Sequence, residues 1–285
     1  MSGRLFNRAW KVTAYTAAPA AYFTQVRKAV EITDLRVQFS VEKHLAKEPN
    51  AATLTVTNAS KTTRSFLETK PLIVQIAAGY DGVARHLFTG DLRFAKSTHE
   101  STDWETELQL GDGDRAYRYA RVSRSYKAGT SVIVALREAA AALGLDLPGP
   151  ITTSPALATQ FAAGVVLHGP ARDELTKLLA PYGYHWSIQD GKLVILKDAE
   201  IRADRAIVIS ADAGMIGSPE FGEPATKGAP PSLTVRTLLY PEVTPGGKIS
   251  VESRSIRGVF KVVRVVHAGD SHGDDWTTEI EARPA

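Results

Sequence analysis

The 285-residue sequence contains no cysteine. Disulfide bonds, thiolate metal ligands and cysteine nucleophiles are therefore excluded. The absence of cysteine also fits a protein that is assembled in a reducing cytoplasm, although it does not require that compartment.

Long apolar runs are missing as well. The N-terminal residues lack the apolar core of a signal peptide, and no later run has the ~20 apolar residues that a membrane-spanning helix needs. The composition, 44% hydrophobic and 23% charged, is typical of a soluble globular protein. We therefore expect a soluble chain with no membrane partner, and no standard export signal if the protein leaves its cell.

Neither sign of charge dominates. The net charge is +3, from 34 Lys and Arg against 31 Asp and Glu, which is far from the dense basic stripe of a dedicated DNA-binding protein. The length has room for two domains of ordinary size or three small ones.

Motifs of catalysis are also lacking. No glycine-rich phosphate loop joins a strand to a helix, and no serine sits in a nucleophile elbow. Gly111–Asp114 lacks the further ligands of an EF-hand, and we interpret it as a turn at the end of a domain. We therefore expect no enzymatic activity and no cofactor.

The densest polar cluster lies between residues 267 and 275. Its candidate metal ligands are His267, Asp270, His272 and Asp274. Gly and Asp are also the usual residues of tight turns, and the cluster links two expected strands. We favour a hairpin loop over a metal site, because the spacing matches no established metal loop.

One short pattern occurs twice, and the chain is organised around it. Asp103-Trp104-Glu105-Thr106-Glu107-Leu108 is followed, 172 positions later (276 − 104), by Asp275-Trp276-Thr277-Thr278-Glu279-Ile280. An upstream phenylalanine keeps a spacing of 16 residues in both copies, from Phe88 to Trp104 and from Phe260 to Trp276. These landmarks indicate two copies of one β module, with Trp104 and Trp276 as core anchors.

The hydrophobic pattern of the chain changes from strand-like to mixed and back to strand-like, which predicts three domains: residues 1–118, 119–203 and 204–285. Period-two alternation from Leu35 to Glu42 is typical of a half-buried strand and begins an antiparallel β domain. In the middle, Ser131 and Pro170 open two helices and Asp190-Gly191 marks a hairpin, giving a small α+β domain. The chain then returns to β strands.

One strand of the last domain differs from its counterpart. It would be apolar on both faces, because it contains Val262, Val263, Val265 and Val266. Each face must then be buried, one by the core and the other by a second packing partner. Val263 and Val265 are therefore candidates for a contact with another module or another subunit.

The layout of two β modules around an α+β insert resembles the baseplate hub proteins of contractile-tailed phages and phage-like injection systems, the late-control protein D-like family. The resemblance covers nearly the whole chain and is carried, in order, by five stretches: Asp34–Lys43, Pro49–Asn58, Leu87–Asp91, Trp186–Leu193 and His267–Ser271.

The resemblance implies a mainly β fold with two tail-tube-like β-barrels flanking the insert. It implies a homotrimer whose six barrels form a pseudo-hexameric ring, joining a sixfold tail tube or tube initiator to a threefold central spike, with the tape measure protein and baseplate wedge as further partners. DNA would pass through the lumen without specific binding. The location implied is the tail baseplate of a virion, assembled in the cytoplasm of a host bacterium.

Two alternatives stay open. Tyr126–Thr130, followed by helix, loop and helix, resembles a LysM repeat and would make the middle domain a peptidoglycan-binding module. The second alternative is a metal-dependent enzyme built on the loop from His267 to Asp275.

Overall fold

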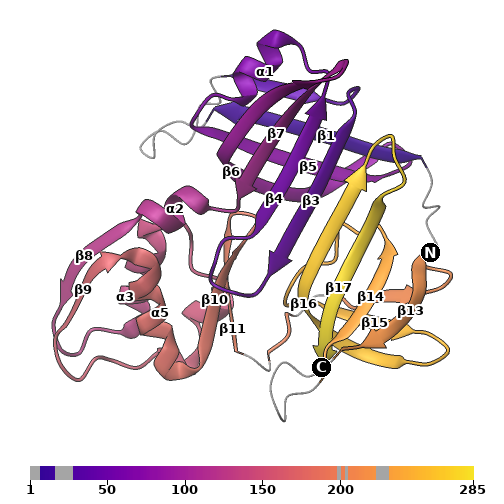
Figure 1. The fold of residues 1–285 in the computed structure, drawn as a ribbon. Coiled ribbons are helices and arrows are strands. Elements are labelled where there is room, and N and C mark those ends of the chain that lie inside the picture. The colour runs from indigo at the N-terminus through magenta and orange to yellow at the C-terminus, as the bar shows by residue number, and fades with distance from the viewer. Residues whose placement is uncertain (1–6, 17–27, 198–199, 203–204, 223–230) are drawn as a thin grey trace. The chain divides into compact units, whose positions relative to one another are not determined.

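A computed structural model describes residues 7–16, 28–197, 200–202, 205–222 and 231–285. The chain is mainly β, as the alternating patterns predict, and it divides into two compact units (Figure 1). We call Met1–Leu45, Asn50–Gly111 and Ile201–Ala285 the β unit, and Ala46–Pro49 with Asp112–Glu200 the α+β unit.

The β unit combines strands from the N-terminal and the C-terminal parts of the chain in one sheet of 13 described strands. We call its N-terminal part the first module: β1 (Arg8–Thr16), β2 (Ala29–Ile32), β3 (Val37–His44), β4 (Ala51–Thr57), α1 (Lys61–Leu67), β5 (Leu72–Tyr80), β6 (Val83–Glu100) and β7 (Asp103–Gly111). The second module comprises β12 (Ile207–Ser210), β13 (Met215–Phe221), β14 (Leu233–Leu238), β15 (Lys248–Glu252), β16 (Arg257–Asp270) and β17 (Trp276–Pro284).

The two modules repeat one strand order. The first pairs its strands as β3-β4-β7-β6-β5, and the second as β13-β14-β17-β16-β15, with every one of these pairs antiparallel. They differ beyond that core, because β1 runs antiparallel to β5 whereas β12 runs parallel to β15. The pair β3–β16 joins the modules into one sheet. Among the described strands the order runs open from β13 to β2, so closed barrels are not seen.

A bulge at the same place in β6 and β16 supports the equivalence. The register against the following strand shifts between Leu92 and Phe94 in the first module and between Val262 and Arg264 in the second. A bulge places two residues opposite one and reverses the alternation beyond it. Val262 and Val265, three residues apart, are therefore both in the core of the second module.

The bulge corrects the expectation that this strand is apolar on both faces. Val265 is fully buried and lies opposite Lys43 of β3, so its contacts are inside the chain. Val263 occupies the bulge and is half-buried. A role for Val263 in a subunit interface stays a prediction.

The α+β unit has its own core of buried side chains. Its elements are α2 (Asp114–Tyr119), β8 (Arg121–Tyr126), α3 (Val132–Ala142), α4 (Gly149–Thr152), the 3-10 turn η1 (Pro155–Leu157), β9 (Val165–Pro170), α5 (Ala171–Leu179), the 3-10 turn η2 (Ala180–Tyr182), β10 (Tyr184–Gln189) and β11 (Lys192–Lys197). Ser131 caps α3 through a bond from the Ile133 amide. Asp190 and Gly191 form the β10–β11 turn with positive φ, as their sequence predicts.

The pairing of β8 with β9 is a feature that the sequence patterns did not indicate. The three domain boundaries proposed from the sequence stay a prediction beside the two compact units. In the described part of the chain, none of the helices is both long enough and apolar enough to cross a membrane.

Candidate functional site at the seam between the modules

The two modules meet along a seam where β3 and β16 pair. Residues 38–44 of β3 lie antiparallel to residues 264–270 of β16, in the register that sets Gln38 opposite Asp270. Arg264 Nε contacts Glu42 Oε1 at 2.6 Å across the seam. This hydrogen bond is the main cause of the lowered pKa of Glu42, so the pair stays charged at neutral pH.

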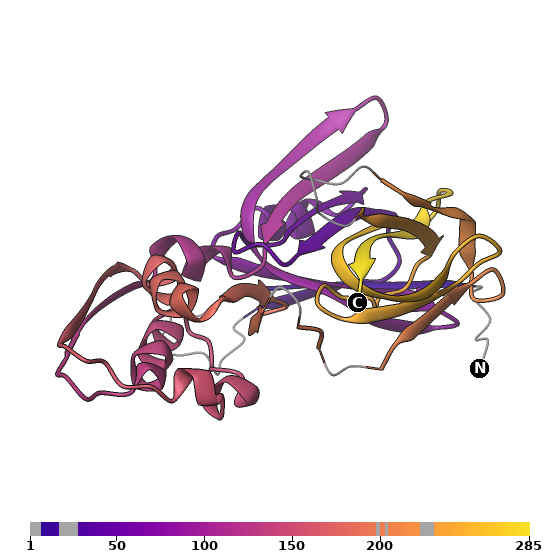
Figure 2. The ribbon, with the colours of Figure 1, turned by 90° about the horizontal axis from the view of Figure 1, so that it is seen from below.

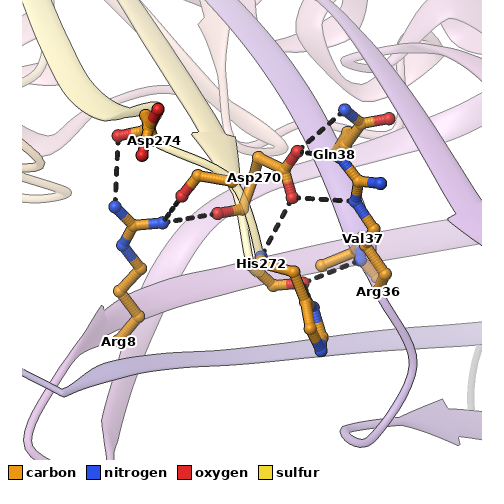
Figure 3. Close-up of polar contacts among 9 residues, drawn as sticks. Arg8, Arg36, Val37, Gln38, Asp270, His272 and Asp274 are labelled. Carbon is orange, nitrogen blue, oxygen red and sulfur yellow. Dashed lines mark hydrogen bonds and ion pairs between the residues drawn. The ribbon is translucent and has the colours of Figure 1, made fainter.

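Asp270 ends β16 and anchors the loop that follows it (Figure 3). Arg36 donates two hydrogen bonds to its carboxylate, from Nε to Oδ1 at 3.1 Å and from Nη2 to Oδ2 at 2.6 Å. Gln38 Nε2 donates to Oδ2 at 2.9 Å, and the His272 amide donates to Oδ1 at 2.9 Å. Chiefly through Arg36, these donors hold the pKa of Asp270 well below its usual range.

Arg8 of β1 contacts the backbone of the same loop (Figure 3). Its guanidinium donates to the backbone oxygens of Asp270 at 2.8 Å, Gly273, and Asp274 at 3.1 Å. Ser271 adds a reciprocal pair of bonds with the Val37 backbone, each 2.9 Å long. The loop of the second module is therefore fastened to two strands of the first.

Trp276 lies beneath this loop. Its side chain is 2% exposed and belongs to the core of the first module, although β17 belongs to the second. The ring of Phe39 meets it edge-on at 5.4 Å, and the Arg8 guanidinium lies 5.4 Å from its ring centroid. Gly269 leaves space for these rings, since a Cβ there would collide with both.

Trp104, the counterpart of Trp276 in the repeated pattern, is not a core anchor. Its side chain is 37% exposed, with Arg64 3.8 Å above its ring. Thr106, Leu108 and Leu110 on the same face of β7 are buried, whereas Trp104 lies towards the tip of the β6–β7 hairpin, beyond that core. The alternation predicted which face of the strand is buried, but not the position along β7 at which the core that covers this face ends.

The four candidate metal ligands are not brought together as a metal site. His267 is fully buried, with Nδ1 2.9 Å from Thr278 Oγ1, whereas the Asp270 carboxylate is occupied by Arg36 and Gln38. No group of three or more His, Asp or Glu among the described residues could hold a metal ion. The polar residues of the loop serve to dock one module on the other.

Burial lowers the pKa of His267 to about 3, and the nearby charge of Lys43 adds to this effect. His267 is therefore a neutral member of the seam at physiological pH.

Sequence reasoning missed the partners of the loop. Arg36 and Gln38 were expected only as the polar face of a strand, and Arg8 lay in a segment without a strand prediction. Arg36 and Asp270 are separated by 234 residues, so no local pattern could connect them. The nearest signal was the unusual number of hydrogen-bonding side chains in the His267–Asp275 loop.

The fold is similar to those of several solved structures. The 43 kDa tail protein of prophage MuSo2 from Shewanella oneidensis gives a TM-score of 0.64 at 8% identity, covering 98% of this chain and 97% of that chain. A tail protein from Neisseria meningitidis MC58 also gives 0.64, at 12% identity and the same coverage. A type VI secretion component from E. coli, described as similar to T4 bacteriophage tail proteins, gives 0.58 at 12% identity, covering 88% and 74%.

At these identities the likeness establishes a shared fold. The resemblance to tail proteins that the sequence predicts is confirmed at that level. Neither a family model nor a curated protein matches the sequence.

Proposed function

We propose that this chain is a structural hub of a phage-type tail baseplate. Three copies form a ring of six similar modules, which joins a sixfold tail tube to a threefold central spike. The observation that carries the proposal is the repeated strand order, β3-β4-β7-β6-β5 and β13-β14-β17-β16-β15, within one chain. Two similar but unequal modules per chain are what a connector between sixfold and threefold symmetry requires.

The seam supports this role. A connector must keep its two modules at a fixed spacing, and the loop at Asp270 does so with a bidentate ion pair, backbone bonds from Arg8 and a buried tryptophan. The role is architectural and uses no catalytic group. The similarity to tail proteins extends over 98% of the chain, so both modules and the insert take part in it.

The partners follow from the same proposal. Each module acts as a curved, tube-like β element: one face of the ring meets the tail tube or its initiator, and the other meets the spike. The tape measure protein and a baseplate wedge are further neighbours. DNA passes through the lumen without being held, which a net charge of +3 allows. The protein acts in the virion tail after assembly in the host cytoplasm.

Sedimentation equilibrium and electron microscopy test the proposal. We expect three copies per particle and a ring with six lobes, either for the purified protein or when it is co-expressed with the spike protein of the same particle. A complex of two or four copies, or a chain that stays monomeric even with the spike, would contradict it.

A further inference from the structure

The contact between the two modules, the pair of β3 with β16, occurs only once among the described strands, although the elements that form it are duplicated. Inside the chain, the hairpin β16–β17 of the second module docks on β3 of the first. The equivalent hairpin is β6–β7, and the equivalent of β3 is β13, because the strand orders match. A β6–β13 pair does not occur among the described strands of this chain. The hairpin β6–β7 and the strand β13 are therefore equivalent to two elements that pair with each other, but they do not pair within the described part of the chain.

The hairpin side of this missing contact is open. Residues 257–261 of β16 pair with β15, and residues 264–270 continue past it to pair with β3. In the first module, β6 pairs with β5 up to Asp91 and continues to Glu100 with only β7 beside it, among the described strands. The bulges align residues 94–100 of β6 with residues 264–270 of β16. The hairpin projects from the sheet in Figure 2.

Large apolar side chains mark this open hairpin. Phe94 is 44% exposed and Trp104 is 37% exposed. Trp276, in the equivalent place, is covered by Phe39 and Arg8 of the other module. Exposed aromatic residues beside an unpaired strand edge are typical of an interaction surface.

The edge side of the missing contact is open as well. β13 ends the strand order among the described strands, and its Ile216 and Phe221 are 38% and 50% exposed. Its pairing with β14 makes Phe221 the equivalent of Val41, which lies opposite His267 in the seam. β13 also carries a bulge at residues 217–219, so we count the register from Glu220.

We infer that residues 94–100 of β6 in one copy pair antiparallel with the outer edge of β13 in a second copy. The contact repeats between chains the seam that β16 and β3 form within one. It rests on the proposed function, to which it adds the strands that join the subunits. The register sets Ser97 opposite Phe221 and Thr98 opposite Glu220.

This contact is head-to-tail. Each module offers a hairpin to the next module and an edge strand to the previous one, and the two seams alternate around the assembly. Such a heterologous contact closes into a ring when the rotation per copy permits. A partner of another kind would have to reproduce the same strand pairing, whereas a second copy already carries the matching edge.

Engineered cysteines test the contact, since the chain has none of its own. One preparation carries Thr98→Cys, and a second, with a tag of different mass, carries Glu220→Cys. Residues directly opposite in an antiparallel pair have Cα atoms about 4.5–5.5 Å apart, which suits a disulfide. We expect a mixed-tag disulfide on oxidation. The control replaces Thr98→Cys by Val83→Cys, which is exposed but outside the hairpin tip, and should give none.

Mass measured on the same samples separates this inference from the proposed function. A mixed disulfide in a trimer supports both, and a mixed disulfide in a complex of another size supports the contact alone. A trimer without the disulfide overturns the β6–β13 contact but leaves the proposed hub function intact. If the purified protein is monomeric, the same cysteine pair is co-expressed with the spike: a trimer without the disulfide then overturns the contact alone, and a chain that stays monomeric overturns both the contact and the hub.

A second variant guards against a disulfide trapped by chance encounters. Trp104→Ala should raise the dissociation constant of the assembly by at least about tenfold, as expected when a large aromatic side chain is removed from an interface. Val83→Ala, the matched exposed substitution, should leave that constant unchanged. Equal effects of the two substitutions would overturn the inference.

Discussion

Asp270 accepts bonds from Arg36, Gln38 and the His272 amide, so its charge is the electrostatic centre of the seam. Asp270→Asn keeps the shape of the side chain and removes the charge. We expect a loss of about 2 kcal/mol in the free energy of unfolding, because Arg36 is partly exposed and water replaces some of what it loses. Urea denaturation at neutral pH measures it.

Asp274 provides the control for that substitution. It is exposed in the same loop and contacts Arg8 through its backbone oxygen alone among the bonds described, so Asp274→Asn should change stability by less than about 0.5 kcal/mol. Equal losses in the two variants would show that the Asp270 carboxylate does not hold the seam.

His267 makes stability depend on pH. Its pKa is about 3 in the folded chain and about 6.5 when unfolded, so between these values the unfolded state binds the extra proton. Stability from this group is complete above pH ~6.5 and falls as the pH drops, by about 2 kcal/mol between pH 7 and pH 5. Urea denaturation at these two pH values measures the loss.

His267→Gln provides the comparison, because glutamine does not titrate. The difference in stability between the two pH values should shrink by about 2 kcal/mol in this variant. An unchanged difference would mean that His267 is not the group responsible.

At this scale the sequence indicated the loop but not its chemistry. The cluster of His267, Asp270, His272 and Asp274 was visible as a polar turn, and the preference for a turn over a metal site rested on the turn-forming residues and on the spacing. Its two side-chain donors, Arg36 and Gln38, which bind the Asp270 carboxylate, lie more than 200 residues away, at the start of β3. Local patterns contain no information about such a contact.

At the scale of elements, the two tryptophans of the repeat differ in their environments. Trp276 is 2% exposed and Trp104 is 37% exposed. Trp276→Ala should lower the free energy of unfolding by about 3–5 kcal/mol, whereas Trp104→Ala should lower it by less than about 1 kcal/mol. Thermal and urea unfolding of the two variants checks this, and equal losses would contradict the assigned environments.

Period two predicted most strands of the β unit, and their faces, correctly. It failed at β16 because a bulge shifts the alternation. Val262 and Val265 therefore lie in the same core, although strict alternation would place them on opposite faces. The bulges also show that the spacing of 16 from phenylalanine to tryptophan is not the structural correspondence. Residues of β6 align with β16 at an offset of 170, whereas residues of β7 align with β17 at 172.

At the scale of the whole molecule, the α+β unit has a core of its own and continuous chain from Asp112 to Glu200. Asp112 closes it locally, since its carboxylate accepts the amides of Asp190 and Gly191. We expect residues 112–200 to fold when expressed alone, giving a cooperative thermal transition by circular dichroism.

The fully buried Leu175 supplies the control. Leu175→Ala should lower the transition of the fragment, since such a truncation costs about 2–5 kcal/mol. A fragment without a cooperative transition would show that the unit depends on the rest of the chain.

The duplication was visible in the sequence through Trp104 and Trp276, but its use was not. The strand order shared by the modules, and the single β3–β16 pair that joins them, depend on pairings between distant residues. Composition and periodicity predict that strands exist, whereas long-range pairing decides which strands are neighbours.

The β3–β16 seam also places a demand on synthesis of the chain. β3 is complete at His44, yet its partner strand ends at Asp270, 226 residues later (270 − 44). At about 5–20 residues per second, a ribosome needs about 10–45 s to supply that partner. Throughout this interval the nascent chain carries an open strand edge, and a product cut short before β16 keeps it permanently. A chain that terminates before β16 is therefore expected to aggregate through the unpaired edge of β3.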